Sequence, residues 1–446
     1  MKWKPYPKYK DSGVDWLGEV PQHWTVAALA YRYEVALGKM LDDKQIVGDH
    51  LAPYLRNADV QWDRILTTNL PRMDFSTQDR HRFGLRPGDL LVCEGGEVGR
   101  AAIWSGELEE CFYQKALHRL RAYRTSGDNG RFMLYVLWDS ALKGRFTGCE
   151  GRSTIAHLTA EALRRYLFAF APEPEQVQIA AYLDREAAKI DTLIAKQERL
   201  IELLQEKKQA LISQVVTKGI AINAPMKLSR VEWLGDVPAH WRVTALKRVC
   251  DLITDGTHQP PQRTDEGYPL LSVRNLVGGR FINLPDDSHI SEVEYRLLVK
   301  HFRVKSGDLV LAIVGATLGK AALVEDMPPF AIQRSLAVIR TKPGELLNRY
   351  LLYYIRSSFL QELLWRSVGF SAQPGIYLGD LANLPVPLPP HAEQVRIVER
   401  LESRLQLLDD LEYKAKQSID LMREHRIAII SAAATGKIDV REPAHA

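Results

Sequence analysis

The sequence predicts an α+β protein built from two similar globular domains, each followed by a long helix. Three observations lead to this fold class. The chain repeats itself once, at a separation of about 218 residues. Each copy holds short β-type runs punctuated by glycine and aspartate, which is typical of strands and turns. Each copy then ends in a long run with helical periodicity, residues 175–218 and 393–437.

The repeat extends along the whole chain. Residues 12–24 read SGVDWLGEVPQHW, and residues 229–241, offset by 217, read SRVEWLGDVPAHW. Further on, PGDLLV at 87–92 corresponds to SGDLVL at 306–311, an offset of 219. Because the offset stays between 217 and 220, the halves are nearly gap-free copies. A period this long indicates duplicated domains and not a solenoid.

The two long runs have the spacing of a two-stranded helical seam. In the first run, apolar or small residues alternate at intervals of four and three, interrupted by Gln197 and Lys208, at Leu183, Ala187, Ile190, Ile194, Ile201, Leu204, Leu211 and Val215. Adding 218 gives Leu401, Leu405, Leu408, Glu412, Ile419, Met422, Ile429 and Ala433. Two seams of equal length suggest that the helices pack on each other, in a pseudo-twofold arrangement. A solvated hairpin that only spaces the domains is the alternative.

These patterns predict a division of the chain. We expect a first globular domain over residues 1–172, a first long helix over 173–220, a second globular domain over 221–388, a second long helix over 389–437 and a tail over 438–446. A proline-containing stretch precedes each long helix, as expected for a residue that a helix interior excludes. Gly219 is a suitable cap for the end of the first long helix.

Composition restricts the function only loosely. The formal charge of +4 and the pI of about 8.7 permit a polyanionic partner without requiring one. Four cysteines without C-x-x-C spacing argue against a disulfide framework or a zinc site. No run approaches the ~18 apolar residues of a membrane span. The basic N-terminus lacks the apolar segment of a secretory signal, so we expect a cytoplasmic protein.

No catalytic or metal-binding constellation emerges from the sequence. G-A-T-L-G-K-A at 315–321 has the wrong glycine spacing for a phosphate-binding loop, and Ala321 stands where a Ser or Thr must reach the metal. M-P-P-F at 327–330 resembles a methyltransferase tetrad, but Met327 cannot accept hydrogen bonds from an amine. We therefore expect a protein with no catalytic residues.

Three elements together resemble one family, the specificity subunits of type I restriction–modification systems. They are the W-L-G-x-V-P-x-H-W opening, the internal G-D-L, and the P-x-x-E-Q-x-x-I start of each long helix, at residues 172–179 and 390–397. The second copy also carries D-G-T-H, at residues 255–258, which is similar to a loop of these recognition domains. The first copy departs from this pattern, with L-G-K-M at residues 37–40.

The resemblance implies a non-catalytic protein that reads double-stranded DNA. Each globular domain would recognise one half of a bipartite target, and the paired antiparallel helices would separate the domains by a non-specific spacer. Two modification (methyltransferase) subunits would dock on the helices, and restriction (translocase and nuclease) subunits would complete the complex. S-adenosylmethionine, ATP and Mg²⁺ would be bound by those partners, which would carry out adenine methylation and restriction. No cofactor is expected on this chain.

Candidate DNA contacts follow from the chemistry of readout, in which cations and backbone N–H groups bind phosphates while Arg, Asn and Gln bind base edges. Arg56–Asn57 and Arg274–Asn275 lie at one predicted repeat position, offset by 218. The other candidates come from the glycine turns, the Gln–cation dipeptides, the D-G-T-H loop and a glycine-rich loop: Gly96, Arg100, Lys320, Gln114, Lys115, Gln333, Arg334, Thr257, His258, Arg152 and Ser153. For each, a purely structural role is the competing interpretation.

The outward face of the first long helix provides candidates for partner contacts: Lys196, Arg199, Glu206 and Lys207. Two other functions remain as alternatives. One is a coiled-coil scaffold that binds only protein. The other is a fused methyltransferase–recognition enzyme, against which the missing tetrad argues.

Overall fold

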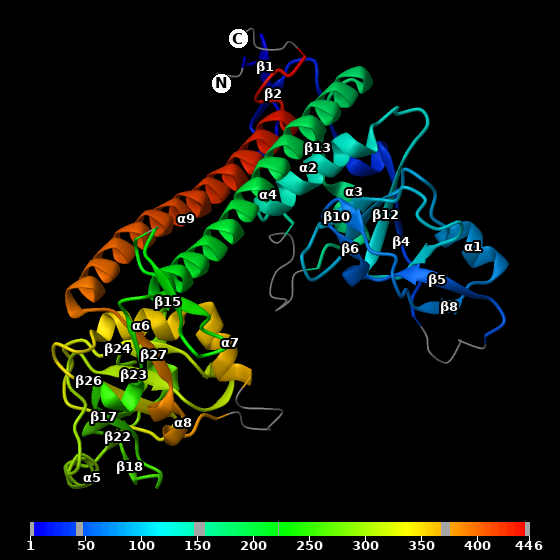
Figure 1. Cartoon of the computed structure of the whole chain (residues 1–446). Helices are drawn as coiled ribbons and strands as arrows, with labels where there is room; N and C mark the ends of the chain where they lie inside the picture. The colour runs from blue at the N-terminus through cyan, green and yellow to red at the C-terminus, as the bar shows by residue number, and fades with distance from the viewer. Residues whose placement is uncertain (1–3, 42–47, 147–156, 222, 367–374, 442–446) are drawn as a thin grey trace. The chain divides into compact units, whose positions relative to one another are not determined.

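The structure is a computed structural model of the 446-residue chain, and it describes residues 4–41, 48–146, 157–221, 223–366 and 375–441. The fold divides into two compact units (Figure 1). Unit 1 comprises Met1–Gln197 with Gln417–Ala446, and unit 2 comprises Glu198–Lys416. The division passes through both long helices, so each unit contains one half of each helix and one globular part.

The globular part of unit 1 is built on an antiparallel four-stranded sheet in the order β10-β9-β12-β4. Its strands are β4 Tyr33–Leu37, β9 Leu90–Cys93, β10 Ala101–Ile103 and β12 Leu117–Ala122. A second sheet pairs β5 Leu51–Leu55 with β8 Arg72–Asp74 and, in parallel, with β11 Phe112–Tyr113. The remaining elements are β1 Tyr9–Asp11, β2 Glu19–Pro21, β3 Thr25–Ala28, β6 Val60–Gln61, β7 Arg64–Ile65, β13 Leu167–Phe170, α1 Thr77–Phe83, α2 Gly130–Leu142 and α3 Ala160–Arg165.

Unit 2 repeats this plan. Its main sheet has the order β17-β26-β23-β24, with strands Cys250–Asp255, Leu336–Thr341, Leu309–Ala312 and Ala321–Leu323. The second sheet again contains one parallel pair, β19 Tyr268–Leu271 with β25 Ala331–Ile332, and adds β18 Arg263–Thr264 and β22 His289–Ile290. The other elements are β14 Met226–Leu228, β15 Asp236–Pro238, β16 Arg242–Ala245, β20 Leu276–Val277, β21 Arg280–Phe281, β27 Pro385–Leu388, α5 Glu292–Leu298, α6 Asn348–Arg356, α7 Ser358–Arg366 and α8 Leu378–Asn383.

Both long helices are uninterrupted: α4 spans Glu173–Lys218 and α9 spans His391–Ala434 (Figure 1). The predicted seam is buried or half-buried at every position, and it continues through Gln197 and Lys208. Because their spacing keeps the four–three alternation, these two polar residues occupy seam positions and do not interrupt the pattern. Gly219 follows α4 at a φ of +73°, with its N–H bonded to the carbonyl of Val215, as predicted for a cap.

The repeated motifs meet at the start of each long helix. In unit 1, Glu175 of α4 accepts hydrogen bonds from Trp24 Nε1 at 2.9 Å and Tyr6 Oη at 2.7 Å, and it pairs with His23 Nε2 at 2.7 Å. In unit 2, Glu393 binds Trp241 and His240 in the same way. The H-W and E-Q motifs are therefore the two sides of one joint between a globular part and its helix.

The glutamine of each E-Q pair fixes the preceding helix as well. Gln176 accepts a hydrogen bond from the Asn129 N–H, which caps α2, at 2.9 Å. Gln394 accepts one from the Leu347 N–H, which precedes α6, at 2.7 Å. Both glutamines are completely buried, so a satisfied amide here is a requirement of the fold.

Candidate nucleic-acid interface

In each unit, one edge of the main sheet gathers several loops that are distant in sequence. The register pairs Leu117 with Cys93 and His118 with Leu37, so β4 and β9 end where β12 begins. The turn after β9, the segment after β4 and the segment before β12 therefore emerge side by side. In unit 2 the register of β17, β23 and β26 produces the same arrangement. We call this end of the sheet the loop edge.

A glycine in each unit allows two of these loops to touch. A Cβ on Gly38 would lie 2.3 Å from the Gln114 carbonyl oxygen, and a Cβ on Gly256 would lie 2.2 Å from the Ile332 carbonyl oxygen. Real side chains do not tolerate such distances, so only glycine fits. This glycine is the one residue that D-G-T-H and L-G-K-M share, a signal that the sequence analysis did not use.

The loops joined in this way carry the Gln–cation dipeptides. The Lys115 N–H donates to the Lys39 carbonyl at 2.8 Å, and the Arg334 N–H donates to the Thr257 carbonyl at 3.1 Å. The preceding glutamines, Gln114 and Gln333, are anchored by their N–H groups to the last residues of β5 and β19. The predicted equivalence of the two dipeptides is therefore confirmed.

The side chains of these dipeptides are unengaged. Within the described ranges, none of the side chains of Gln114, Lys115, Gln333 and Arg334 makes a hydrogen bond or ion pair. Lys115 and Arg334 are exposed, and both glutamines are half-buried. Each unit thus presents an amide, which can pair with a base edge, next to a cation that can bind a phosphate or a guanine.

Arg56, Asn57 and Arg100 have partners within their own unit. The Arg56 guanidinium makes a two-pronged bond with Asp59 at 2.9 Å from both Nε and Nη2, and this contact raises the pKa of Arg56. Asn57 donates to the Gly95 carbonyl at 2.7 Å and accepts from Arg100 Nη2 at 2.8 Å. This network braces the glycine turn, in which Gly96 is exposed at a φ of +72°.

The predicted equivalence of Arg56–Asn57 with Arg274–Asn275 is wrong. The Leu66 N–H bonds to the Asp59 carbonyl, and the Ile282 N–H bonds to the Asn275 carbonyl, so the structural counterpart of Asn275 is Asp59. The local offset is therefore 216, because the chain from the end of β4 to the end of β5 is two residues longer than the chain from the end of β17 to the end of β19. The shared R-N letters are a coincidence of sequence.

Asn275 also has no free group to offer a base. It is completely buried, its Oδ1 accepts from the Ser272 N–H at 2.9 Å, and its Nδ2 donates to the Ile282 carbonyl and to Asp287. Arg274 is half-exposed and pairs with Asp286. The buried Asn275 side chain therefore stabilises the turn between Ser272 and Asp287 through these hydrogen bonds.

The third predicted pair of cations differs between the units. Arg100 and Lys320 are equivalent, since their carbonyls accept from the N–H groups of Cys93 and Ala312, each at 2.8 Å. The Arg100 side chain turns inward to Asn57, whereas Lys320 is exposed. Of these two cations, only Lys320 has no partner among the described residues and could therefore bind an external anion.

The D-G-T-H and L-G-K-M loops differ in what they expose. His258 Nε2 lies 2.9 Å from Asp255 Oδ2, and the Thr257 hydroxyl donates to the Gln259 carbonyl. In unit 1, Lys39 reaches the Asp74 carbonyl at 2.6 Å and Asp79 at 2.8 Å. Burial acts to raise the pKa of Asp79, but hydrogen bonds from Lys39 and Ser76 lower it overall. The Lys39 ammonium is therefore already bonded within unit 1, whereas the His258 side chain is exposed at the surface.

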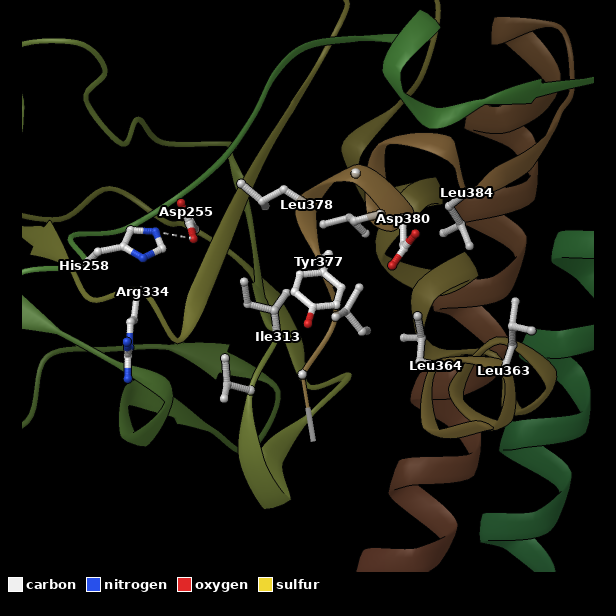
Figure 2. Close-up of a pocket in the computed structure, with 15 residues that line it drawn as sticks. Asp255, His258, Ile313, Arg334, Leu363, Leu364, Tyr377, Leu378, Asp380 and Leu384 are labelled. Atoms are coloured by element: carbon white, nitrogen blue, oxygen red, sulfur yellow. Dashed lines mark hydrogen bonds and ion pairs between the residues drawn. The ribbon is translucent and has the colours of Figure 1, made fainter. Parts of the chain in front are cut away.

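A pocket of about 940 Å³ opens at the loop edge of unit 2. Figure 2 shows Asp255, His258 and Arg334 on one side of it and the leucines Leu363, Leu364 and Leu384 on the other. Tyr377, which is 80% exposed, stands between the two sides (Figure 2). The pocket therefore combines an acid, a histidine and a cation with an aromatic ring.

Several predicted residues fall elsewhere. Arg152 and Ser153, together with their counterparts in residues 367–374, lie outside the described residues. Their described neighbours return to the loop edge, since Leu158 bonds to the Glu94 carbonyl and Ile376 to the Ile313 carbonyl. The four partner candidates are all exposed on α4: Lys196, Arg199, Glu206 and Lys207.

Within the part of the chain that the structure describes, no group of three or more His, Cys, Asp or Glu side chains is placed to hold a metal ion. Among the same residues, no helix has both the length and the apolar character needed to cross a bilayer.

Comparisons with known proteins agree with this architecture. Residues 238–421 match the family model of the type I restriction modification DNA specificity domain. The type I restriction enzyme EcoBI specificity subunit of Escherichia coli is 25% identical over 378 residues, which cover 82% of this chain and 76% of that protein.

Two solved structures have a similar fold. One, described as concerning complex assembly and conformational transition of the type I R-M system, has a TM-score of 0.70 at 18% identity and covers 93% of this chain and 98% of that one. The HsdS subunit from Thermoanaerobacter tengcongensis has a TM-score of 0.59 at 18% identity and covers 94% and 98%. Residues 238–421 thus match the type I restriction modification DNA specificity domain, and the whole chain resembles type I restriction–modification specificity subunits in sequence and fold.

Proposed function

We propose that this chain reads double-stranded DNA at the two loop edges, each edge recognising one half of a bipartite target. The observation that carries the proposal is the pair of equivalent, unengaged dipeptides, Gln114–Lys115 and Gln333–Arg334, each held by a glycine-dependent loop contact. An amide beside a cation on a rigid backbone suits DNA, because it offers one group for a base edge and one for a phosphate.

The differences between the two loop edges support different half-sites. Unit 1 presents a lysine after its glutamine, whereas unit 2 presents an arginine together with His258 and Tyr377. Arginine can make a two-pronged contact with guanine, while lysine acts as a compact point charge. The shared backbone thus positions both edges alike, and the unshared side chains supply the discrimination.

The chemistry of the complete system would belong to partner proteins. Two modification subunits would dock on the exposed faces of α4 and α9, and restriction subunits would join them. Adenine methylation and cleavage would take place on those subunits, which would bind S-adenosylmethionine, ATP and Mg²⁺. The long helices would set the spacer between the half-sites, because a continuous helix has a defined rise of ~1.5 Å per residue.

The proposal is tested by selecting bound duplexes from a randomised pool with the chain in complex with its modification subunits. We expect enrichment of a two-part motif, with Gln333→Ala relaxing one part and Gln114→Ala relaxing the other. Arg334→Ala should weaken binding and, if it removes one phosphate contact, reduce the slope of log K against log salt by about one. Arg242→Ala, an exposed cation at the start of β16 away from the loop edge, is the matched control.

Selection of no motif would refute the proposal and leave a protein-binding scaffold as the function. A two-part motif that Gln114→Ala and Gln333→Ala leave unchanged would show instead that DNA is read by other residues.

A further inference from the structure

Each unit joins its globular part to the adjoining long helix through three equivalent residues, an arginine, a tyrosine and an acid, which we call the clamp. In unit 1, Arg131 Nε and the Tyr135 hydroxyl of α2 both reach Asp184 of α4, at 2.6 and 2.7 Å. In unit 2, Arg349 and Tyr353 of α6 reach Glu402 of α9, at 2.6 and 3.4 Å. Positions around this clamp can therefore be compared one by one.

Beside the clamp in unit 1, aromatic rings fill the space. Trp62, at the tip of the β6–β7 hairpin, stacks on Trp138 of α2 with ring centroids 5.0 Å apart and planes 10° apart. The guanidinium of Arg426, from α9, lies 4.7 Å from the centre of the Trp138 ring. Stacking and cation–π attraction together hold the hairpin against the helices.

In unit 2, the counterparts of both tryptophans are missing. The β20–β21 hairpin carries Gly278 and Gly279 at the positions of Trp62 and Asp63, because β6 pairs with β7 in the same two-residue register. Arg356, seven residues after Arg349, replaces Trp138, which lies seven residues after Arg131. Lys208 of α4 corresponds to Arg426 of α9, which lies 218 residues later. Lys208 binds Asp409 and Arg426 binds Asp191, and these two acids are also 218 residues apart.

The missing rings leave a pocket of about 1140 Å³, which we call the clamp pocket. Its walls include apolar groups (Ile212, Leu276 and Leu405) and the Tyr353 ring, with Arg356 and Lys320 as cations. Arg356 Nη2 donates to the carbonyls of Gly279 at 2.7 Å and Ala321 at 3.0 Å. Within the described residues, neither Arg356 nor Lys320 pairs with a carboxylate.

Gly279 maintains this geometry, since a Cβ there would lie 2.9 Å from Arg356 Nη2. Two carboxylates, Glu402 and Asp409, also line the pocket, but they pair with Arg349 and Lys208. The pocket therefore offers an apolar, partly aromatic surface next to two cations, Arg356 and Lys320, that have no acidic partner among the described residues. An aromatic ring that enters it would stack as Trp62 does in unit 1, and an adjacent carboxylate would meet Arg356 and Lys320.

We propose that the clamp pocket of unit 2 binds a partner protein through an aromatic side chain that neighbours an acidic residue. Unit 1 fills the equivalent place with its own Trp62 and Trp138, so it has no such site. The interaction would be confined to one of the two units, and it does not depend on DNA reading by the loop edges.

The test uses the full chain and a short peptide in which 5-fluorotryptophan follows aspartate, titrated by ¹⁹F NMR. For a fragment of this size we expect saturable binding with a Kd on the order of 1 mM. Replacing the aspartate with asparagine should weaken binding about fivefold, because charge-assisted hydrogen bonds are lost.

Two variants locate the site. Arg356→Trp imitates unit 1, fills the pocket and should abolish binding. Lys320→Glu changes an exposed side chain that the fold does not use, and it should weaken binding of the aspartate peptide at least as much as the asparagine replacement does. Absence of saturable binding by the wild-type chain, or binding that Lys320→Glu leaves unchanged, would overturn the proposal.

Discussion

Replacing Glu412 tests how much one charged pair contributes to the helical seam of unit 2. Glu412 of α9 lies 2.6 Å from Lys208 of α4, and both side chains are nearly buried, at 13% and 15% exposed. Lys416 also reaches Glu412 at 2.6 Å, and Lys208 reaches Asp409 at 2.5 Å. In unit 1 the position of Glu412 is taken by Ile194, so the seam does not require a charge at this point.

The magnitude follows from the pKa of Glu412. Hydrogen bonds from Lys208 and Lys416 lower this pKa from an ordinary 4.5 to about 2. That difference corresponds to about 3 kcal/mol of folding free energy, shared among the partners of the carboxylate. Because Lys208 keeps Asp409 as a partner, we expect Glu412→Gln to lose about 2 kcal/mol. The double variant Lys208→Met/Glu412→Leu should recover most of this loss, since an apolar pair of similar volume restores the seam.

Hydrogen exchange of the α4 amides around Lys208 measures the effect locally, which avoids assuming that both units unfold together. A double-mutant cycle gives the coupling between Lys208 and Glu412, which we expect to be about 2 kcal/mol. The control is Arg199–Glu202, an ion pair on the same helix with both side chains about 60% exposed. Its coupling should stay below about 0.5 kcal/mol.

The pH dependence has a defined sign. A carboxylate whose pKa is lower in the folded chain stabilises the fold at pH values above about 4.5, and this contribution is lost as the pH falls towards 2. The difference in unfolding free energy between wild type and Glu412→Gln should therefore decrease by about 1 kcal/mol when the pH is lowered from 6 to 3.5. A coupling below about 0.5 kcal/mol, or a gap independent of pH, would refute the reasoning.

Three further predictions concern particular residues and the helices. Asn275→Ala should destabilise unit 2 by about 2–4 kcal/mol, because it removes a buried amide and leaves its partners unsatisfied; hydrogen exchange measures this, and exposed Val277→Ala is the control. Gly256→Ala should cost about 2–3 kcal/mol, since its Cβ would overlap the Ile332 carbonyl, whereas Gly379→Ala has open space and should be neutral in thermal unfolding. Inserting one heptad in each long helix keeps the seam in phase and adds ~10 Å of helix; selection from a duplex pool should then return a spacer about three base pairs longer.

Each of these expectations can fail. Equal stability of Asn275→Ala and wild type would mean that the buried amide contributes nothing net. A neutral Gly256→Ala would show that the two loops separate without cost. An unchanged spacer after the heptad insertion would mean that the helices do not set the distance between half-sites.

The sequence alone was sufficient for the duplication and the seam, and it predicted the ends of both long helices to within three residues. The predicted runs 175–218 and 393–437 correspond to α4 Glu173–Lys218 and α9 His391–Ala434. Periodicity can be read from the local sequence, and it predicts the packing correctly because each seam residue contacts the partner helix at a regular interval. Local pattern does not show where the chain after Asn348 breaks into α6 and α7, which meet at Ser357, whose hydroxyl bonds to the Tyr354 carbonyl.

The joint between globular part and helix was visible in the sequence but could not be interpreted. The H-W and E-Q motifs recur in both halves, yet more than 150 residues separate Trp24 from Glu175. Neither motif indicates which residues it contacts in the folded chain. Only the folded chain shows that the glutamate accepts the indole and imidazole hydrogen bonds.

The tertiary structure decided which candidate side chains are available. Sequence reasoning treated Asn275 and Gln333 alike, because both are amides next to a cation. In the structure Asn275 is completely buried with its amide satisfied, whereas Gln333 makes no side-chain bond within the described residues. Availability depends on neighbours that are not adjacent in sequence: Asp287 lies twelve residues from Asn275, and among the residues that the structure describes no such partner reaches Gln333. The sequence by itself therefore determined the architecture, and tertiary packing determined which polar groups remain free to act.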